Sequence, residues 1–307
     1  MRGNWKPGIP AFVLALGALL LGGCGAASRQ PASRGAIPVV AAENFYGDVL
    51  KQVCGTRCAV TSILNDPNAD PHLYESNVQD ALAVARASLV VENGMGYDTF
   101  MRHLLDAAPK AGRQVIDVQR LVGAAAGGNP HLWYSTQTMV QVADAAATDL
   151  GRIDPAGRAA FQDAADRFAA SLAPISREID LIRTADPNAP VAYTEPVFGY
   201  MGQALGFRVL TPAAFQRAIE EGNDPAAADL ATEETILTRH QAHVLIYNLQ
   251  TVTPVTTRIE DLARANGVPV VGVSETEPPG ETYQQWMLAQ LRAVQAALAK
   301  GSAAGGQ

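Results

Sequence analysis

The chain has 307 residues, of which 48% are hydrophobic and 17% charged, and its formal net charge is −7. These values are typical of an ordinary globular protein. The acidic balance argues against a nucleic-acid partner, because that function needs a basic binding face. A cationic ligand is compatible with the charge, although the net charge says little about any one site.

The N-terminus is predicted to be an export signal. Arg2 and Lys6 precede an apolar run over residues 11–21. Because this run is too short to cross a hydrocarbon core of ~30 Å as a helix, residues 1–23 are expected to be a leader that is removed.

The end of this leader carries a more specific signal. Residues 21–24 read Leu-Gly-Gly-Cys, which resembles the lipobox of bacterial lipoproteins. The resemblance implies that Cys24 is lipidated and becomes the first residue of the mature chain. Residues 24–36 are small and polar, as in a flexible tether. The predicted location is therefore the cell membrane, with the protein held by lipid on the extracytoplasmic side.

Two further cysteines agree with export. Cys54 and Cys58 are separated by Gly-Thr-Arg, and in an oxidising compartment so close a pair is expected to form a disulfide. Gly55 would give the tight loop its backbone freedom. A metal site or a redox pair is the alternative, but the spacing is not Cys-x-x-Cys and no histidine follows nearby.

From residue 37 onward, short apolar runs alternate with helical patterns, which indicates an α/β architecture with parallel sheets. Strands are predicted at 37–42, 58–64, 89–93 and 114–118. Helices are predicted between them at 44–53, 77–87 and 101–107. Together these elements make a first lobe over residues 37–150.

A long helical region is predicted next, over residues 151–186. Asp154 and Pro155 suit a helix start, as a carboxylate cap followed by proline in the first turn. One apolar face is formed by residues three, four or seven apart, namely Phe161, Phe168, Ile175, Ile179 and Ile182. Pro174 predicts a kink or a brief break in this helix.

The alternation then restarts and predicts a second lobe over residues 187–300. Its strands are expected at 191–194, 207–210, 244–247 and 269–273, and its helices at 199–204, 229–239, 253–266 and 282–300. Residues 301–307 are expected to be a disordered tail. The predicted fold class is α/β, with two lobes of parallel-sheet type joined by a long helix.

Four polar segments follow predicted strands, at the edge where open α/β sheets bind their ligands. In the first lobe, residues 70–75 and 129–134 share the order polar residue, proline, histidine, leucine and aromatic residue. Proline restricts the backbone before each histidine, so the imidazole is presented at a low entropic cost. In the second lobe, residues 193–200 and 273–280 carry glutamates.

These segments resemble the ligand motifs of the metal-specific solute-binding proteins of ABC importers, which include zinc receptors and manganese-binding lipoproteins. The resemblance extends over about residues 37–298. It implies that His72 and His131 bind the metal. Glu195 falls on a third position that is His in many zinc receptors and Glu in manganese receptors. Glu275 falls on the fourth, which is usually Asp, and Glu277 is the alternative there.

The chemistry of this ligand set is consistent with the resemblance. Two neutral imidazoles and two carboxylates make a charge-neutral site for a divalent cation. Carboxylate oxygens suit harder ions such as Mn²⁺. A carboxylate can also bind through both of its oxygens, which raises the coordination number above the four that zinc prefers. Glu195 and the absence of a His-rich loop favour manganese. Zinc remains the alternative, because the intrinsic affinity order favours it at almost any such site.

The resemblance implies an extracytoplasmic receptor, monomeric and not an enzyme, that holds one Mn²⁺ or Zn²⁺ between its lobes and delivers it to an ABC permease. A nearly rigid connecting helix is implied as well, which limits hinge motion. Four protein ligands would leave no open position for the activation of water. The alternatives are a surface adhesin with structural metal, a receptor for another metal such as iron, and a metallohydrolase with Glu277 as general base.

Overall fold

The computed structural model describes residues 35–67 and 74–304. The predicted leader, Cys24, most of the tether and His72 lie outside the described residues. All elements named below belong to one structural unit that begins at Ala36. In the part of the chain that is described, no helix has the length and apolar character needed to cross a membrane.

The first lobe is a four-stranded parallel sheet in the order β2-β1-β3-β4. Its two inner strands carry mostly buried side chains, as expected for a parallel sheet covered on both faces. The strands are β1 (Ile37–Glu43), β2 (Cys58–Leu64), β3 (Leu89–Glu92) and β4 (Gln114–Asp117). The helices are α1 (Asn44–Cys54), α2 (Val78–Arg86), α3 (Thr99–Ala107), α4 (Val118–Val122) and α5 (Thr136–Ile153).

The second lobe repeats this topology, with the strand order β6-β5-β7-β8. Its strands are β5 (Pro190–Tyr193), β6 (Arg208–Val209), β7 (Val244–Asn248) and β8 (Val270–Val273). Its helices are α8 (Gly199–Leu205), α9 (Ala213–Glu220), α10 (Ala227–Thr238), α11 (Pro254–Ala265) and α12 (Tyr283–Ala304). In each lobe the chain order reverses between the first and third strands, and this switch point is where open sheets bind ligands.

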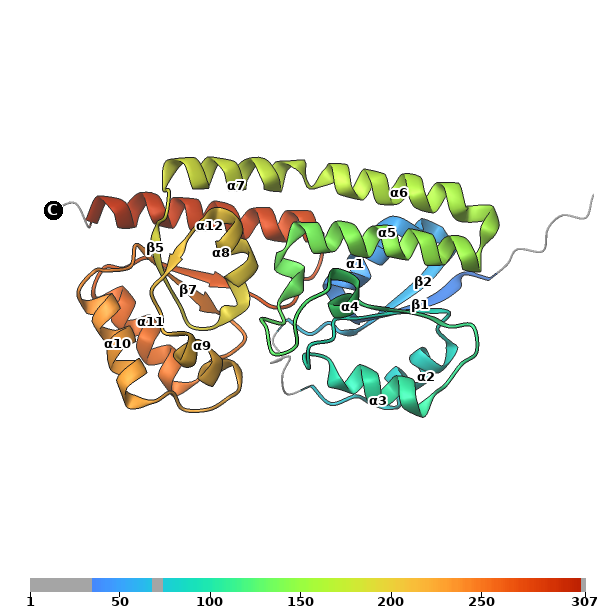
Figure 1. Cartoon of the computed structure of the whole chain (residues 1–307), viewed down its shortest axis with the longest axis horizontal. Helices are drawn as coiled ribbons and strands as arrows, with labels where there is room; N and C mark the ends of the chain where they lie inside the picture. Colours follow the sequence, from blue (N-terminus) through green and yellow to red (C-terminus); the bar gives the residue numbers. More distant parts are fainter. Residues whose placement is uncertain (1–34, 68–73, 305–307) are drawn as a thin grey trace, which may run out of the picture. The chain divides into compact units, whose positions relative to one another are not determined.

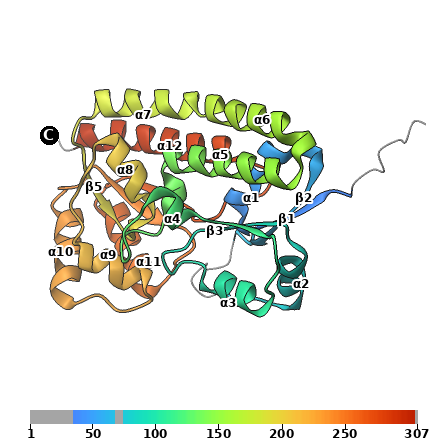
Figure 2. The same ribbon diagram turned by 45° about the vertical axis from the view of Figure 1, so that its right-hand side comes forward.

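The connection between the lobes is two helices rather than one. Helix α6 (Arg158–Ser171) and helix α7 (Ala173–Ala185) are separated at Leu172, so the break predicted near Pro174 is present. Proline is tolerated in the first turn of α7, where an N–H would have no intrahelical partner. Figures 1 and 2 show α7 alongside α12 on one side of the lobes.

Some boundaries differ from the sequence predictions. The predicted helix start is confirmed in position, because Asp154 is the N-cap of a 3-10 turn (Pro155–Gly157) that leads into α6, but Asp154 makes no side-chain cap there. Helices α4, α5 and α9 were not predicted. Helix α12 continues to Ala304, so the expected tail at 301–307 does not begin at Gly301.

One apolar core joins both lobes to the connecting helices. It includes Val39 and Phe45 in the first lobe, Ile182 on α7, Val244 in the second lobe and Leu291 on α12. Smaller cores lie under the outer helices of each lobe. Because the central core is continuous, the two sheet edges are held opposite one another by packing as well as by chain connection.

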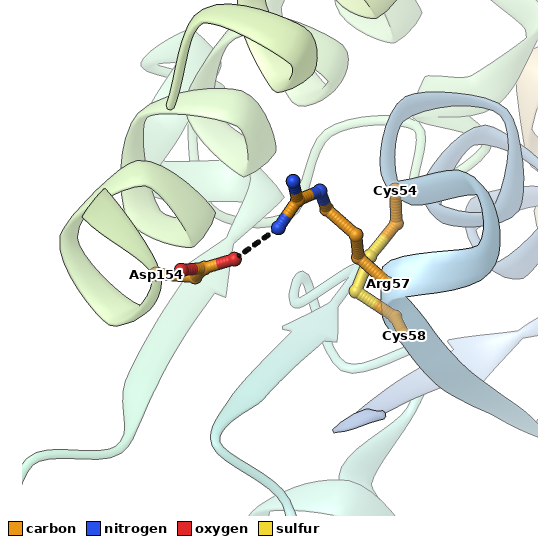
Figure 3. Close-up of a disulfide and its surroundings, with 4 residues drawn as sticks. All are labelled: Cys54, Arg57, Cys58 and Asp154. Atoms are coloured by element: carbon orange, nitrogen blue, oxygen red, sulfur yellow. Dashed lines mark hydrogen bonds and ion pairs between the residues drawn. A yellow bond between two sulfur atoms is a disulfide. The ribbon is translucent and has the colours of Figure 1, made fainter. Parts of the chain in front are cut away.

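The predicted disulfide is present at the end of α1. Cys54 and Cys58 are bonded, with their Cα atoms 5.7 Å apart. Gly55 has a φ of 56°, in the left-handed region that favours glycine. Figure 3 shows Arg57 from the same turn reaching Asp154, with Nη1 donating to Oδ2 at 2.7 Å. The turn is therefore fixed both by the disulfide and by an ion pair to the segment before α6.

Replacing both cysteines, Cys54→Ser with Cys58→Ser, should lower the free energy of unfolding by about 2 kcal/mol, because so short a loop restricts the unfolded chain only modestly. The melting temperature should fall by about 5 °C. Scanning fluorimetry with and without reductant measures this, and reductant should not shift the double variant further. Two free thiols in the non-reduced wild-type protein, found by mass spectrometry, would contradict the disulfide.

Candidate metal centre

His131 lies in the loop between α4 and α5, and its ring is fully buried. Asn129 Oδ1 accepts from the backbone N–H of His131 at 3.0 Å and lies 2.7 Å from its Nδ1. This contact assigns the ring proton to Nδ1 and leaves Nε2 as the basic nitrogen. Nε2 lies 3.4 Å from Glu275 Oε2, in the second lobe. Nε2 of His131 is therefore presented toward the other lobe.

Glu195 and Glu275 meet at the edge of the second sheet. Glu195 follows β5, Glu275 follows β8, and both are buried. Asn248, the last residue of β7, donates from Nδ2 to Glu195 Oε2 at 2.6 Å and to Glu275 Oε1 at 2.7 Å. A single amide thus holds two carboxylates beside one another.

The first lobe contributes a further contact to this group. Tyr97, which follows β3, donates its hydroxyl to Glu275 Oε2 at 2.9 Å. Asn129 Nδ2 donates to the carbonyl of Pro196, next to Glu195, at 2.7 Å. Sequence reasoning missed Tyr97, Asn129 and Asn248. The rule that ligands lie at strand ends could have identified Asn248, but asparagine and tyrosine are too common in loops to stand out.

Glu277 faces a different part of the molecule. Its backbone N–H donates to Asn44 Oδ1 at 3.0 Å, and Asn44 Nδ2 donates to its carbonyl at 2.7 Å. Burial, followed by the charge of Asp48, raises the pKa of the Glu277 carboxyl to about 9. It lines a cavity with Asn44, Asp48 and Lys51. Of the two candidates for the fourth position, Glu275 is the one beside His131 and Glu195.

The site is strongly acidic. Burial is the main cause that raises the pKa of Glu195 to about 8, and the negative charges of Glu275 and Glu220 act in the same direction. The Asn248 hydrogen bond opposes them. Burial and the Glu275 charge also raise the pKa of Tyr97 well above its usual value. A cation at this place would relieve the repulsion between the carboxylates.

His131 Nε2 and Glu195 Oε1 are among the buried polar atoms of the described residues that lack a hydrogen-bond partner. Such orphaned atoms require an explanation, and a bound ion is one. Within residues 35–67 and 74–304, no three His, Cys, Asp or Glu side chains are arranged to hold a metal ion by themselves. His72 lies outside these ranges. Imidazole nitrogen with carboxylate oxygen is nevertheless a donor set that suits divalent transition metals.

A cleft of about 1210 Å³ opens beside this group. Tyr97 and Pro130 line it from the first lobe, and Glu220, Gln250 and Thr251 line it from the second. Gln250 Oε1 also accepts from the backbone N–H of Glu275 at 2.6 Å. The buried carboxylates therefore lie next to a solvent path between the lobes.

Comparison with known proteins identifies the family. Residues 39–297 match the family described as zinc-uptake complex component A, periplasmic. The chain belongs to this family. Its predicted family and its two-lobed α/β fold are thereby confirmed.

Individual relatives are distant but extend over much of the chain. The manganese-binding lipoprotein MntA of Halalkalibacterium halodurans is 26% identical over 205 residues, covering 64% of this chain and 67% of the relative. The iron ABC transporter substrate-binding lipoprotein MtsA of Streptococcus pyogenes is 23% identical, covering 93% and 96%. The solute-binding protein FpvC of Pseudomonas aeruginosa, solved with Mn²⁺, has a TM-score of 0.71 at 20% identity, covering 86% and 98%. Each of these relatives is named for binding a metal or a transported substrate.

Asn248→Ala should lower the free energy of unfolding of the chelator-treated protein by about 2 kcal/mol, because two buried carboxylates lose their shared donor. Urea titration followed by tryptophan fluorescence measures this loss. Asn223→Ala is the matched control, since Asn223 makes an exposed hydrogen bond to a glutamate, and its effect should stay within about 0.5 kcal/mol. Equal effects of the two substitutions would show that Asn248 does not hold the carboxylates in place.

Proposed function

We propose that this protein is the extracytoplasmic receptor of an ABC importer and carries one divalent transition-metal ion bound by His72, His131, Glu195 and Glu275. The main support is the meeting of His131 from one lobe with the paired carboxylates of the other, in a buried acidic group. In the sequence, the segment that carries His72 follows β2, which ends at Leu64.

The relatives support a transition metal as cargo. The family is named for zinc uptake, MntA for manganese and MtsA for iron. We propose Mn²⁺ as the cargo, with Zn²⁺ as the alternative, because the site supplies as many carboxylates as imidazoles and carboxylate oxygens suit the harder ion.

Capture follows from the placement of the ligands on two lobes. An ion entering the cleft would offset the charges of Glu195 and Glu275 and accept the lone pair of His131. Binding through both lobes would then hold the sheet edges together, since each lobe supplies part of the coordination. The continuous core limits how far the lobes separate, so release requires the permease to act on a nearly rigid receptor.

A lipid anchor would make delivery efficient. We propose that Cys24 carries the lipid and that residues 24–36 act as the tether. A short flexible linker raises the effective concentration of the receptor at the permease without any new contact.

The alternatives receive less support from the geometry. A metallohydrolase needs an open coordination position and a general base near the metal. The backbone of the candidate base, Glu277, is bonded to Asn44, and Glu277 lines a cavity with Asp48 and Lys51 that His131 does not line. A surface adhesin with structural metal would keep its ion until the protein unfolds, whereas a receptor would exchange it with a chelator.

Titration of the chelator-stripped protein with Mn²⁺ should raise the free energy of unfolding by about 4 kcal/mol at a thousand times Kd. The corresponding increase in melting temperature is on the order of 10 °C for a chain of this size. Parallel titrations with Zn²⁺ and Fe²⁺ rank the metals, and the bound metal is counted by elemental analysis. The increase should be absent in His131→Ala. No increase with any of the three ions would refute the receptor function.

Glu275→Ala should weaken Mn²⁺ binding by about a hundredfold or more, because it removes a ligand and leaves Asn248 with only one carboxylate. Glu277→Ala is the matched control at the same loop, and its Kd should stay within about threefold of wild type. Isothermal titration calorimetry measures both. Similar losses in the two variants would mean that Glu275 has been assigned wrongly or that both glutamates bind.

A further inference from the structure

Glu43, the last residue of β1, is a buried carboxylate that the ligand set above does not use. Its side chain is fully buried, and neither carboxylate oxygen has a hydrogen-bond partner. Removing a carboxylate from water costs several kcal/mol unless a cation or donors compensate. A residue kept in this condition is therefore a candidate for binding a cation.

The groups around Glu43 do not supply that compensation. Burial, followed by the negative charges of Asp98 and Glu92, raises the pKa of the Glu43 carboxyl well above its usual value, and only the backbone amide of Glu43 itself opposes this. Both neighbours have partners of their own. Asp98 accepts from the backbone N–H groups of Asn93 and Gly94 at 2.6 and 2.9 Å, and Glu92 lies 3.6 Å from Arg102 Nη2.

Glu43 also lies at the ligand-binding edge of the first sheet. Strand β1 lies between β2 and β3, so its end is at the switch point of this lobe. Glu43 is in register with Leu64, the end of β2, from which the chain leads to the segment carrying His72. On the other side, Asn93 Nδ2 donates to the carbonyl of Pro130, directly before His131, at 2.9 Å.

Tyr97 relates Glu43 to a carboxylate of the other lobe through electrostatics. The charges of Glu275 and Glu43 both act on the hydroxyl of Tyr97, and this hydroxyl is bonded to Glu275. The Tyr97 hydroxyl is therefore acted on by a carboxyl group from each lobe.

The repeated topology gives an independent reason to regard Glu43 as part of the site. In the second lobe, the strand at the switch point leads into Glu195, and the third strand ends in Asn248. In the first lobe, the corresponding strand ends in Glu43, and the third strand is followed by Asn93. Glu43 with Asn93 thus occupies the place in its lobe that Glu195 with Asn248 occupies in the other.

We propose that Glu43 is a fifth residue of the metal site, the counterpart of Glu195 in the first lobe, and supplies a carboxylate oxygen to an ion that takes more than four ligands. This inference rests on the proposed function. The ion would complete a grouping that the described side chains do not make by themselves. Mn²⁺ gains more from such an oxygen than Zn²⁺, because zinc prefers four ligands and manganese accepts a larger, oxygen-rich set.

The test is calorimetric titration of Glu43→Gln with Mn²⁺ and with Zn²⁺. The variant keeps the shape of the side chain and removes its charge. We expect the Kd for Mn²⁺ to rise by about tenfold or more and the Kd for Zn²⁺ to rise less. The melting temperature without metal should be unchanged or higher, because an uncompensated buried carboxylate is lost.

Glu233→Gln is the matched control. Glu233 on α10 is also fully buried, but it interacts with the Thr211 hydroxyl and does not lie at a switch point. Its substitution should leave both Kd values unchanged. Glu43→Asp, which keeps the charge, should retain more Mn²⁺ affinity than Glu43→Gln and provides a second variant if the glutamine form does not fold.

The outcomes separate this inference from the proposed function. A Kd for Mn²⁺ within about twofold of wild type in folded Glu43→Gln overturns the role of Glu43 and leaves the receptor function intact. The same is true if Glu233→Gln loses as much affinity. A wild-type protein that binds no ion, by contrast, overturns the receptor function and this inference with it.

Discussion

Negative charge buried at the facing edges of two sheets is the constraint on which the rest of this structure depends. Glu43, Glu195 and Glu275 are each nearly or fully buried, and ionised carboxylates in such places are costly without a compensating partner. The Asn248 amide and the Tyr97 hydroxyl offset part of the cost through hydrogen bonds. A divalent ion would offset much more of it. The stability of the protein and the capture of its cargo are therefore linked, because an ion that binds only the folded form stabilises it by mass action.

The framework keeps these groups in place through contacts that cross between the lobes. Tyr134 donates to the carbonyl of Ser274 at 2.7 Å, next to Glu275, and Asn129 reaches Pro196, next to Glu195. Each crossing bond fixes the backbone adjacent to a proposed ligand. Together with the continuous core, they leave the ligand side chains as the part of the site most free to adjust.

The sequence was sufficient for the strands, because short apolar runs between glycines and polar turns are typical of buried parallel strands. It also predicted the break near Pro174 and the disulfide. Helix α5 was missed because its buried face is rich in alanine, at positions such as Ala143, Ala146 and Ala147, and alanine gives a weak periodic signal. The shared strand order of the lobes depends on pairing between distant segments, which local patterns do not reveal. Glu43 was missed for a related reason, since at the residue before α1 a glutamate resembles an ordinary helix N-terminus.

The hydrogen bonds of the site also bear on which metal it prefers. Asn248 donates to Oε2 of Glu195 and Oε1 of Glu275, and Tyr97 donates to Oε2 of Glu275, so Glu195 Oε1 is the one of these four oxygens without such a bond. If the Tyr97 bond gives way, one oxygen of each carboxylate and the two proposed imidazoles would make the four ligands that zinc prefers. An ion with a larger coordination number must also bind the carboxylate oxygens that accept from Asn248. The buried amide group then loses its acceptors, which costs free energy. Glu43, whose carboxylate oxygens have no hydrogen-bond partner, would supply the further oxygen without that loss. This is the physical reason to connect Glu43 with manganese rather than with zinc.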